Sequence, residues 1–438
     1  MKKTFLLIVC AIVLSLFTAV DICAEDGRLE DLSRVQNVYV YNIENDTVLY
    51  SKNENDKIYP ASTVKMMTGI IALEHYNDGY GKLVTVSKES LGSFSGKNIG
   101  LSVGEQLTVE HLLYAVICGG ANDAANVLAY EIAGSHSAFL NMMNKKADEL
   151  GMKNTHYTNA YGYSDPGMYT TAQDTAILAR YAYYIRDYME MCNTARYVIP
   201  ENNLSKKRYV YNSNYLIATN VEIKYKNPEV KGMNAGSTAE GGHVVVTSVS
   251  REGTTNIYVL MGGQIDEDKI YTYSAIKGLI DWSYDSYAYV KILDANEIIC
   301  EMDVSLSSQV DYVVLSPEKT VECYLPSDLD VSKDIKREIK LDQEKLTAPV
   351  EAGFVAGKIK LTYKGEVIAE VNLVAKNNVN RNGFLYILAR IKSFTQSSKF
   401  KIILVVAAVV LVLYFILALR RKRLGNRYKY KYNKYGKK

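Results

Sequence analysis

The longest uncharged stretch of this 438-residue chain is an apolar run near its C-terminus, at residues 402–419. As an α-helix this run would measure about 27 Å at roughly 1.5 Å per residue, which approaches the thickness of a bilayer's hydrocarbon core. A cluster of four basic residues, Arg420–Arg423, follows at once, and such clusters stay on the cytoplasmic side of a membrane. We therefore predict a single-pass protein whose body is extracytoplasmic and whose C-terminal tail is cytoplasmic.

The N-terminus carries a second targeting signal. Lys2 and Lys3 precede an apolar run at residues 5–20, and small residues lie around Ala24. This order of segments is typical of a secretory signal peptide. We interpret residues 1–24 in this way, with an uncleaved membrane anchor as the alternative.

Charge and cysteine content disfavour two classes of function. Residues 1–419 carry 41 basic and 48 acidic side chains, a balance unlike that of a nucleic-acid-binding protein. The cysteines and the five histidines show no metal-binding spacing, so we expect no metal and no cofactor. Cys300 and Cys323 either form a disulfide or remain free thiols.

The hydrophobic pattern changes along the chain. Strands are predicted at residues 35–43, 47–51, 243–250 and 255–261, and helices at 60–76, 107–133, 137–150, 172–189 and 268–283. Two strands, a block of helices and further strands indicate an α+β domain with an antiparallel sheet. From about residue 289, short alternating segments at 312–315, 320–325, 358–363 and 367–374 indicate a small all-β domain.

These patterns divide the chain into six parts. They are a signal peptide (1–24), a catalytic domain (25–288), a small β-rich domain (289–380), a juxtamembrane segment (381–401), a transmembrane helix (402–419) and a basic cytoplasmic tail (420–438). The juxtamembrane segment is apolar with basic residues interspersed, so it either lies in the membrane interface or forms an ordinary connecting helix. From residue 427 on we expect the tail to be disordered.

A serine and a lysine three residues apart are the first candidate catalytic groups. The pattern SxxK begins at Ser62, Ser274, Ser316 and Ser398, so the pattern alone says little. Ser62 differs because it opens a segment that is apolar on most sides, which predicts a buried helix. Free N–H groups at a helix start suit an oxyanion, and a buried Lys65 one turn away would act as a base for the serine. The alternative is an N-cap serine beside a surface lysine.

The segments around Ser62 resemble one enzyme family. Pro60-Ala61-Ser62-Thr63-Val64-Lys65 is similar to the nucleophile segment of serine D-alanyl-D-alanine carboxypeptidases, the low-molecular-weight penicillin-binding proteins. Similar segments follow in the family's order at Gly104-Glu105, Leu112-Leu113, 121–125, 132–134, 149–152, 165–167, 171–172, 347–350 and 357–358. The resemblance covers roughly residues 33–380 and implies a catalytic domain like that of serine β-lactamases and transpeptidases, followed by the family's small β-domain.

The resemblance implies three active-site motifs, of which SxxK is intact. The second, SxN, reads Gly120-Ala121-Asn122, and the third, Lys-Thr-Gly on a strand, reads Asn234-Ala235-Gly236. The implied catalytic residues are Ser62, Lys65 and Asn122, the implied substrate-binding residues are Asn234, Gly236, Ser237 and Thr238, and Gly120 is a degenerate motif position.

Each lost residue has a chemical role in the family. The second serine passes protons, which Gly120 cannot do, and the strand lysine offers a cation to the substrate's terminal carboxylate, which the uncharged Asn234 cannot do. Without that second lysine, Lys65 is expected to hold its proton more strongly. The oxyanion donors, the backbone N–H groups of Ser62 and Ser237, need no particular side chain.

Three nearby polar residues have structural interpretations. Asp123 is expected to cap or brace a helix, and His243 to pack at the start of a strand. Lys231 lies three residues before Asn234, and this odd offset places it on the opposite face of a regular strand.

The resemblance implies a cell-wall enzyme that removes the terminal D-alanine from peptidoglycan stem peptides through a Ser62 acyl-enzyme. Its implied partners are the stem peptide, β-lactam antibiotics and the membrane that holds the C-terminal helix. The alternative is a catalytically impaired pseudoenzyme that binds muropeptide or cell-wall partners, which Gly120 and Asn234 favour. A β-lactamase is a third reading, but no suitably placed extra carboxylate is evident.

Overall fold

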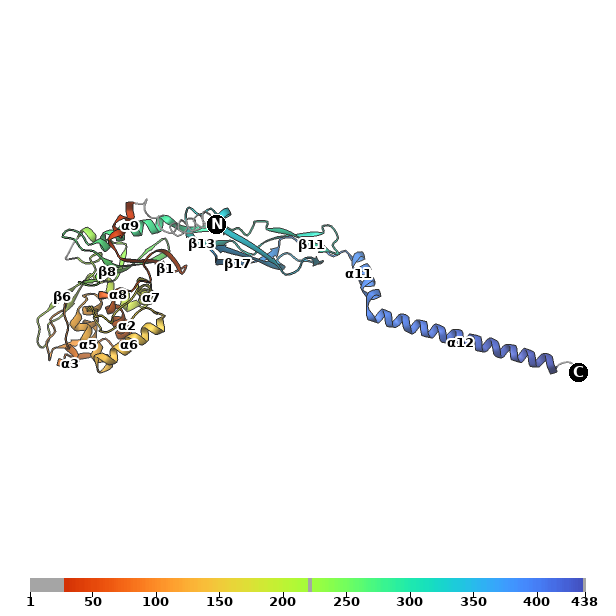
Figure 1. The fold of residues 1–438 in the computed structure, drawn as a ribbon, viewed down its shortest axis with the longest axis horizontal. Coiled ribbons are helices and arrows are strands. Elements are labelled where there is room, and N and C mark those ends of the chain that lie inside the picture. Colours follow the sequence, from red (N-terminus) through yellow and green to blue (C-terminus); the bar gives the residue numbers. More distant parts are fainter. Residues whose placement is uncertain (1–26, 220–222, 436–438) are drawn as a thin grey trace, which may run out of the picture. The chain divides into compact units, whose positions relative to one another are not determined.

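The structure, a computed structural model, describes residues 27–219 and 223–435 (Figure 1). The predicted signal peptide at residues 1–24 lies outside the described residues. The chain divides into two compact units. One unit contains the described residues up to Tyr289 together with the later segment Tyr324–Asp328. The other contains Val290–Cys323 and the described residues from Leu329 on.

The first unit is built on a five-stranded antiparallel sheet in the order β2-β1-β9-β8-β7. Its strands are β1 (Asn37–Asn42), β2 (Thr47–Lys52), β7 (Val230–Thr238), β8 (Gly242–Arg251) and β9 (Thr254–Gly263). The hydrophobic pattern predicted all of these except β7. Only the resemblance, which places the third motif on a strand, pointed to β7, and β7 forms one edge of the sheet.

Helices cover both faces of this sheet (Figure 1). One face shares a buried cluster with α2 (Val64–Tyr76), α4 (Val109–Ile117), α5 (Asn122–Ala133), α6 (His136–Leu150), α7 (Ala172–Tyr183) and α8 (Arg186–Asn193), of which α2, α7 and α8 contact its strands. The other packs against η1 (Gly27–Arg34) and α9 (Tyr271–Ser286). Along β1, Tyr39 and Tyr41 join the first cluster while Val38 and Val40 join the second. Both faces of the strand are thus buried, as in a three-layer domain.

Two predicted helices are each divided in the structure. The pattern at residues 107–133 contains the strand β4 (Gln106–Thr108), α4 and α5, with a break before Asn122. At this break Gly120 has φ +70°, a left-handed conformation that ends the helix. The pattern at 172–189 is divided between α7 and α8, because Ile185 adopts an extended conformation.

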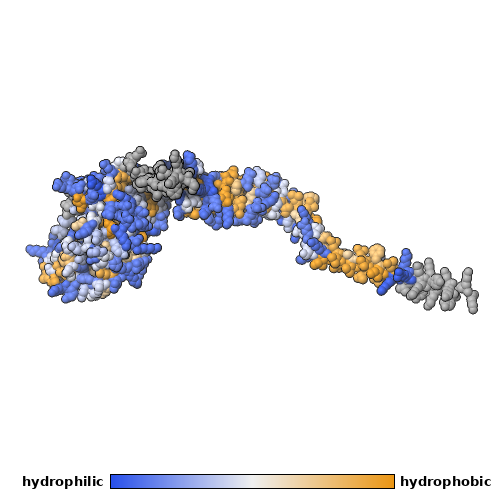
Figure 2. Space-filling model, in the orientation of Figure 1, coloured by the Kyte–Doolittle hydropathy of each residue, from blue (hydrophilic) through white to orange (hydrophobic). Residues whose placement is uncertain are grey.

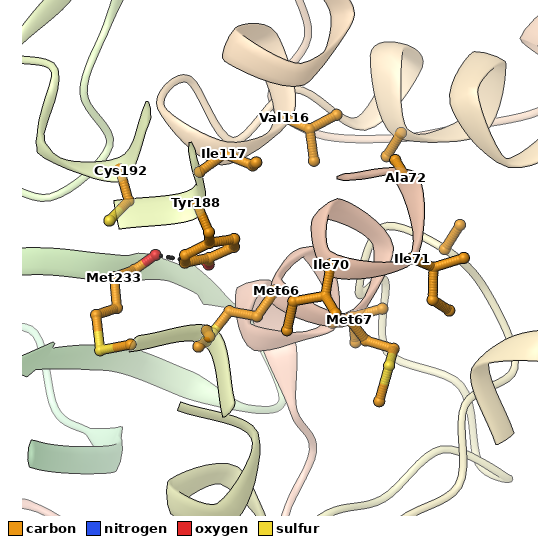
Figure 3. Packing of buried hydrophobic residues seen from close by; sticks show 14 of the residues in the cluster. Met66, Met67, Ile70, Ile71, Ala72, Val116, Ile117, Tyr188, Cys192 and Met233 are labelled. Atoms are coloured by element: carbon orange, nitrogen blue, oxygen red, sulfur yellow. Dashed lines mark hydrogen bonds between the residues drawn. The ribbon is translucent and has the colours of Figure 1, made fainter. Parts of the chain in front are cut away.

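The helix α2 is the centre of the helical layer. Every residue from Val64 to Leu73 is buried, as the apolar pattern predicted. Figure 3 shows Met66 and Ile70 of α2 close to Tyr188 of α8. The hydroxyl of Tyr188 donates a hydrogen bond of 3.0 Å to the backbone oxygen of Met233. A buried polar contact therefore joins α8 to β7 one residue before Asn234.

The second unit contains a six-stranded sheet in the order β14-β16-β17-β12-β11-β15. Its strands are β11 (Cys300–Ser305), β12 (Tyr312–Pro317), β14 (Ile335–Leu341), β15 (Leu346–Thr347), β16 (Val355–Tyr363) and β17 (Glu366–Ala375). Two further strands, β10 (Tyr287–Leu293) and β13 (Val321–Pro326), cross the boundary between the units. Cys300 and Cys323 are free thiols.

Two helices follow the β-strands, α11 (Gly383–Gln396) and α12 (Ser398–Tyr435). Within α12, Ser398–Arg423 is long and apolar enough to cross a membrane. Figure 2 shows the hydrophobic surface of this helix giving way to a hydrophilic band. The prediction of a disordered tail from residue 427 was wrong for the described part, because α12 continues to Tyr435. A helix already formed propagates at little cost into residues that tolerate it.

Candidate active site

Seven of the eight predicted site positions line one cavity of about 530 Å³ in the first unit. They are Ser62, Lys65, Gly120, Asn122, Gly236, Ser237 and Thr238. Three segments far apart in the sequence supply them: the start of α2, the turn before α5 and the edge strand β7. The eighth position, Asn234, is buried and is not part of the cavity wall.

Ser62 lies in the short helix η2 (Ala61–Thr63), directly before α2. The preceding residue, Ala61, has φ +47°, a left-handed conformation that costs a non-glycine residue about 1–3 kcal/mol. Gly162 lies against this turn, because a Cβ atom at Gly162 would be 1.8 Å from the backbone oxygen of Ala61. The serine is thus presented by a strained turn that the neighbouring chain holds in place.

Lys65 is 5% exposed, and its ammonium donates a hydrogen bond of 2.6 Å to the backbone oxygen of Tyr161. Asn159 orders this loop by accepting a hydrogen bond of 2.7 Å from the N–H of Gly162. Burial lowers the pKa of Lys65 to about 7, and the charge of Lys97 also lowers it. Near neutral pH a substantial fraction of Lys65 is therefore uncharged and able to accept a proton.

Asn122 opens α5 and joins it to the loop that follows α3 (Lys88–Leu91). Its side-chain nitrogen donates a hydrogen bond to the backbone oxygen of Ser95. Its side-chain oxygen is buried and has no partner among the described residues. Asn122 itself lines the cavity, and a buried acceptor without a partner is a candidate for binding the amide of a ligand.

Gly236 brings β7 directly against the serine. A Cβ atom at Gly236 would lie 2.6 Å from the Cβ of Ser62, so no larger residue fits without a shift. Asn234 and Gly236 pair with Val246 and Val244 of β8, which face the helical layer. Asn234 therefore points into that layer, and its buried side-chain oxygen has no partner among the described residues.

Thr238 helps to close the end of β7. Its hydroxyl oxygen accepts hydrogen bonds from the N–H of Gly241 at 2.9 Å and from the hydroxyl of Ser164 at 3.1 Å. Ser237, beside it, is exposed at the cavity.

The sequence did not point to two cavity residues, Lys97 and Ser213. Lys97 lies in a loop without a motif, and Asn122 donates a backbone hydrogen bond of 2.8 Å to its backbone oxygen. A Cβ atom at Gly120 would lie 3.6 Å from the hydroxyl oxygen of Ser213. Lys65 was expected to hold its proton more strongly without the strand lysine, but burial and the charge of Lys97 lower its pKa from the usual lysine value.

Asp123 and His243, for which the sequence predicted structural roles, both form contacts within the protein. The carboxylate of Asp123 accepts hydrogen bonds from the N–H groups of Ile99 and Leu101 at 3.2 and 3.0 Å, so it braces a loop. His243 is buried beside Tyr273, with ring centroids 4.7 Å apart, and burial lowers its pKa to about 4.

The prediction that Lys231 lies on the opposite face of β7 from Asn234 was wrong. A β-bulge between Gly232 and Asn234 lets Lys231 pair with Ser248, which has the same parity as Val246. Lys231 is nevertheless exposed and is not part of the cavity wall. In the described ranges, no group of three or more His, Cys, Asp or Glu side chains could hold a metal ion.

Two family models match this chain. The model described as D-alanyl-D-alanine carboxypeptidase matches residues 33–265. The model of the penicillin-binding protein 5 C-terminal domain matches residues 287–381. D-alanyl-D-alanine carboxypeptidase DacF of Bacillus subtilis is 29% identical over 395 residues, which are 89% of this chain and 98% of that protein. DacC of Escherichia coli is 28% identical over 345 residues, 77% of this chain and 82% of that protein.

Solved structures show the same architecture. Penicillin-binding protein 5 of Haemophilus influenzae aligns with a TM-score of 0.56 and 25% identity, over 80% of this chain and 98% of that one. DacD of Francisella tularensis shares the fold with a TM-score of 0.59 at 21% identity, over 83% of this chain and 97% of that one. The first family model alone spans more than half of the chain. The chain therefore belongs to the serine-type D-alanyl-D-alanine carboxypeptidase family and carries the C-terminal domain of penicillin-binding protein 5.

Proposed function

We propose that this protein removes the terminal D-alanine from peptidoglycan stem peptides through an acyl-enzyme on Ser62. The observation that carries the proposal is the pairing, one helical turn apart, of a serine at a helix start with a buried lysine whose pKa is about 7. Family membership supplies the substrate class.

The reaction uses the groups around the cavity. Neutral Lys65 accepts the proton of the Ser62 hydroxyl while the serine oxygen attacks the carbonyl carbon between the two D-alanines. The backbone N–H groups of Ser62 and Ser237 stabilise the oxyanion. The C–N bond then breaks, and the amine of D-alanine takes up the proton as it leaves. Water hydrolyses the remaining ester, which regenerates the serine and releases the shortened peptide.

The other cavity residues position the peptide. The unpartnered oxygen of Asn122 accepts the N–H of the substrate backbone. Gly236 lets β7 approach the serine closely enough for the N–H of Ser237 to reach the oxyanion. Thr238 and Ser237 line the β7 side of the cavity and contact the bound peptide there. β-Lactams acylate the same serine, because they present a strained amide to the same groups.

The second candidate is a protein that binds muropeptide without turnover. Gly120 lacks a hydroxyl, and Asn234 is neutral and buried away from the cavity. Both positions depart from the family's motifs. We favour the enzyme over the binding protein, because Ser62 still lies at a helix start and the buried Lys65 still lies one turn away from it.

Labelled penicillin and mass spectrometry test the proposal. We expect one covalent adduct on the full chain and none on Ser62→Ala. Release of D-alanine from an acyl-D-Ala-D-Ala peptide would establish turnover, whereas an adduct without any release would support the binding protein. An adduct that persists in Ser62→Ala would refute the assignment.

We also propose that α12 holds the protein in the membrane with the residues before it outside and the basic residues 420–438 inside. The support is the apolar window in Ser398–Arg423 and the basic run at its end. Protease added to intact cells should digest the body and leave a fragment containing this tail. Protection of the whole chain would contradict this orientation.

A further inference from the structure

The loop that carries Lys97 is bound firmly to the start of α5. The backbone N–H of Asn122 donates to the backbone oxygen of Lys97 at 2.8 Å, and the Asn122 side chain donates to Ser95. Asp123 accepts two N–H groups further along the loop, and Asn126 donates to Ser93 at 3.2 Å. These bonds from one helix start order the loop, so the Lys97 side chain enters the cavity from a fixed backbone.

Lys97 is the cation of this cavity that is free to meet a ligand, although burial lowers the pKa of its ammonium below the usual lysine value. Lys65, Lys97 and Glu240 are the charged groups of the cavity, and the buried His243 is neutral near pH 7. The other titratable side chains in the wall are tyrosines. Within residues 27–219 and 223–435, no acidic side chain forms an ion pair with Lys97. Lys65 is committed to its bond with Tyr161 and must be neutral to act as a base.

We propose that Lys97 binds the terminal carboxylate of the substrate peptide and takes the place of the strand lysine that Asn234 lacks. The proposal rests on the proposed function, since that function supplies a substrate with a free carboxylate. Its geometric basis is that Lys97 shares the cavity with Ser62 and Asn122, whereas Asn234 does not reach it.

The alternatives on β7 do not fit this role. Asn234 is 4% exposed and points into the helical layer. Lys231 lies on the same face of β7 but is outside the cavity wall. An ammonium group forms a charge-assisted bond with a carboxylate about twice as strong as a neutral hydrogen bond. Placing that ammonium on a loop of the helical layer restores the charge without a lysine on the strand.

A binding experiment tests this assignment without requiring turnover. The full-length Ser62→Ala protein in detergent is titrated calorimetrically with an N-acylated peptide ending in D-Ala-D-Ala. It is then titrated with the same peptide carrying a C-terminal carboxamide. We expect the carboxylate form to bind about tenfold more tightly, as one charge-assisted contact predicts. In the Lys97→Gln background this ratio should fall to about one, and in Lys97→Arg most of it should remain.

One further variant makes the test specific. Lys231→Gln, on the same face of β7, should leave the ratio unchanged. An unchanged ratio in Lys97→Gln, or its loss in Lys231→Gln, would overturn the proposal.

The proposed function is judged separately, by penicillin acylation of the unmodified protein. If acylation succeeds but Lys97→Gln keeps the full ratio, only the role of Lys97 is refuted. If acylation fails while the ratio depends on Lys97, carboxylate binding stands and turnover does not. If the Lys97-containing protein shows no preference for the carboxylate, the role of Lys97 is refuted in either case.

Discussion

A Cβ atom at Gly236 would lie 2.6 Å from the Cβ of Ser62 and 2.9 Å from its hydroxyl oxygen. Real Cβ atoms do not approach other atoms this closely, so Gly236→Ala must push β7 away from Ser62. We expect penicillin acylation to slow by at least about tenfold, because misplacement of the reacting groups by about 1 Å has effects of this size or larger. Rapid-quench kinetics with labelled penicillin measure the rate.

The matched control for this change is Gly81→Ala. A Cβ atom at Gly81 would have no heavy atom within 4 Å, so its acylation rate should equal that of the unmodified protein. The thermal unfolding of both variants separates misplacement from loss of folding, since overpacking costs about 1–3 kcal/mol. An unchanged rate in Gly236→Ala would contradict the close approach.

The acylation rate should follow the ionisation of Lys65. Its pKa is about 7, and only the neutral amine can accept the serine proton. Below pH 7 the rate should therefore fall about tenfold per pH unit, and above pH 8 it should level off. In Lys97→Gln the removal of a neighbouring positive charge raises the pKa of Lys65, so the fall should begin at a higher pH. Coincident profiles for the two proteins would show that Lys97 does not act on the base.

The difference in stability between Lys65→Met and the unmodified protein should depend on pH in a defined direction. The pKa of Lys65 is about 7 in the folded protein and 10.5 in the unfolded chain, so between these values the unfolded chain binds more protons. The original protein therefore gains stability as pH rises from 7 to about 10. At pH 7 the burial of this amine lowers the free energy of unfolding by on the order of 4 kcal/mol.

Part of that cost is offset by the hydrogen bond to Tyr161, which methionine loses. We expect Lys65→Met to be more stable by roughly 2 kcal/mol at pH 7, with the difference shrinking toward pH 10. Urea unfolding at a series of pH values measures it. A difference that grows with pH would contradict the lowered pKa.

Tyr188→Phe should weaken the link between α8 and β7. The hydroxyl of Tyr188 is buried and bonded to the backbone oxygen of Met233, so its removal leaves a buried acceptor unpaired. We expect a loss of about 1–2 kcal/mol in unfolding free energy. Tyr184→Phe, at a tyrosine that is 67% exposed, is the control and should change stability by less than about 0.5 kcal/mol. Equal losses in both variants would show that the buried bond contributes nothing.

The sequence predicted those parts of the fold that periodicity encodes. Met66 and Ile71 lie on different sides of one helix, and this apolar pattern predicted that α2 is buried. The break at Gly120 was not predicted, although Gly119-Gly120 is a turn signal, because the apolar runs at residues 112–117 and 124–129 continue a helical pattern across it. The pattern also misplaced Lys231, because a β-bulge shifts strand parity without any mark in the sequence.

The candidate site was predictable only where a motif carries it. Ser62, Lys65 and Asn122 follow from the resemblance and lie together. Lys97 could not be found this way, because its loop has no motif and its place depends on hydrogen bonds to residues more than 20 positions later. The burial of Asn234 was not predictable either, because the resemblance places the third motif on a strand but does not say how deeply each side chain is buried.

The bonds between Asn122 and the loop of Lys97 have a mechanical consequence. Lys65 on α2 and Lys97 beside α5 both belong to the helical layer, whereas Gly236 and Ser237 belong to the sheet. If the sheet edge moved away from the helices to admit a peptide, the distance between the two amines would stay the same. The pKa of Lys65 would then stay lowered while the cavity is open. Only the N–H of Ser237 on β7 would have to return to its place before the peptide bond is cleaved.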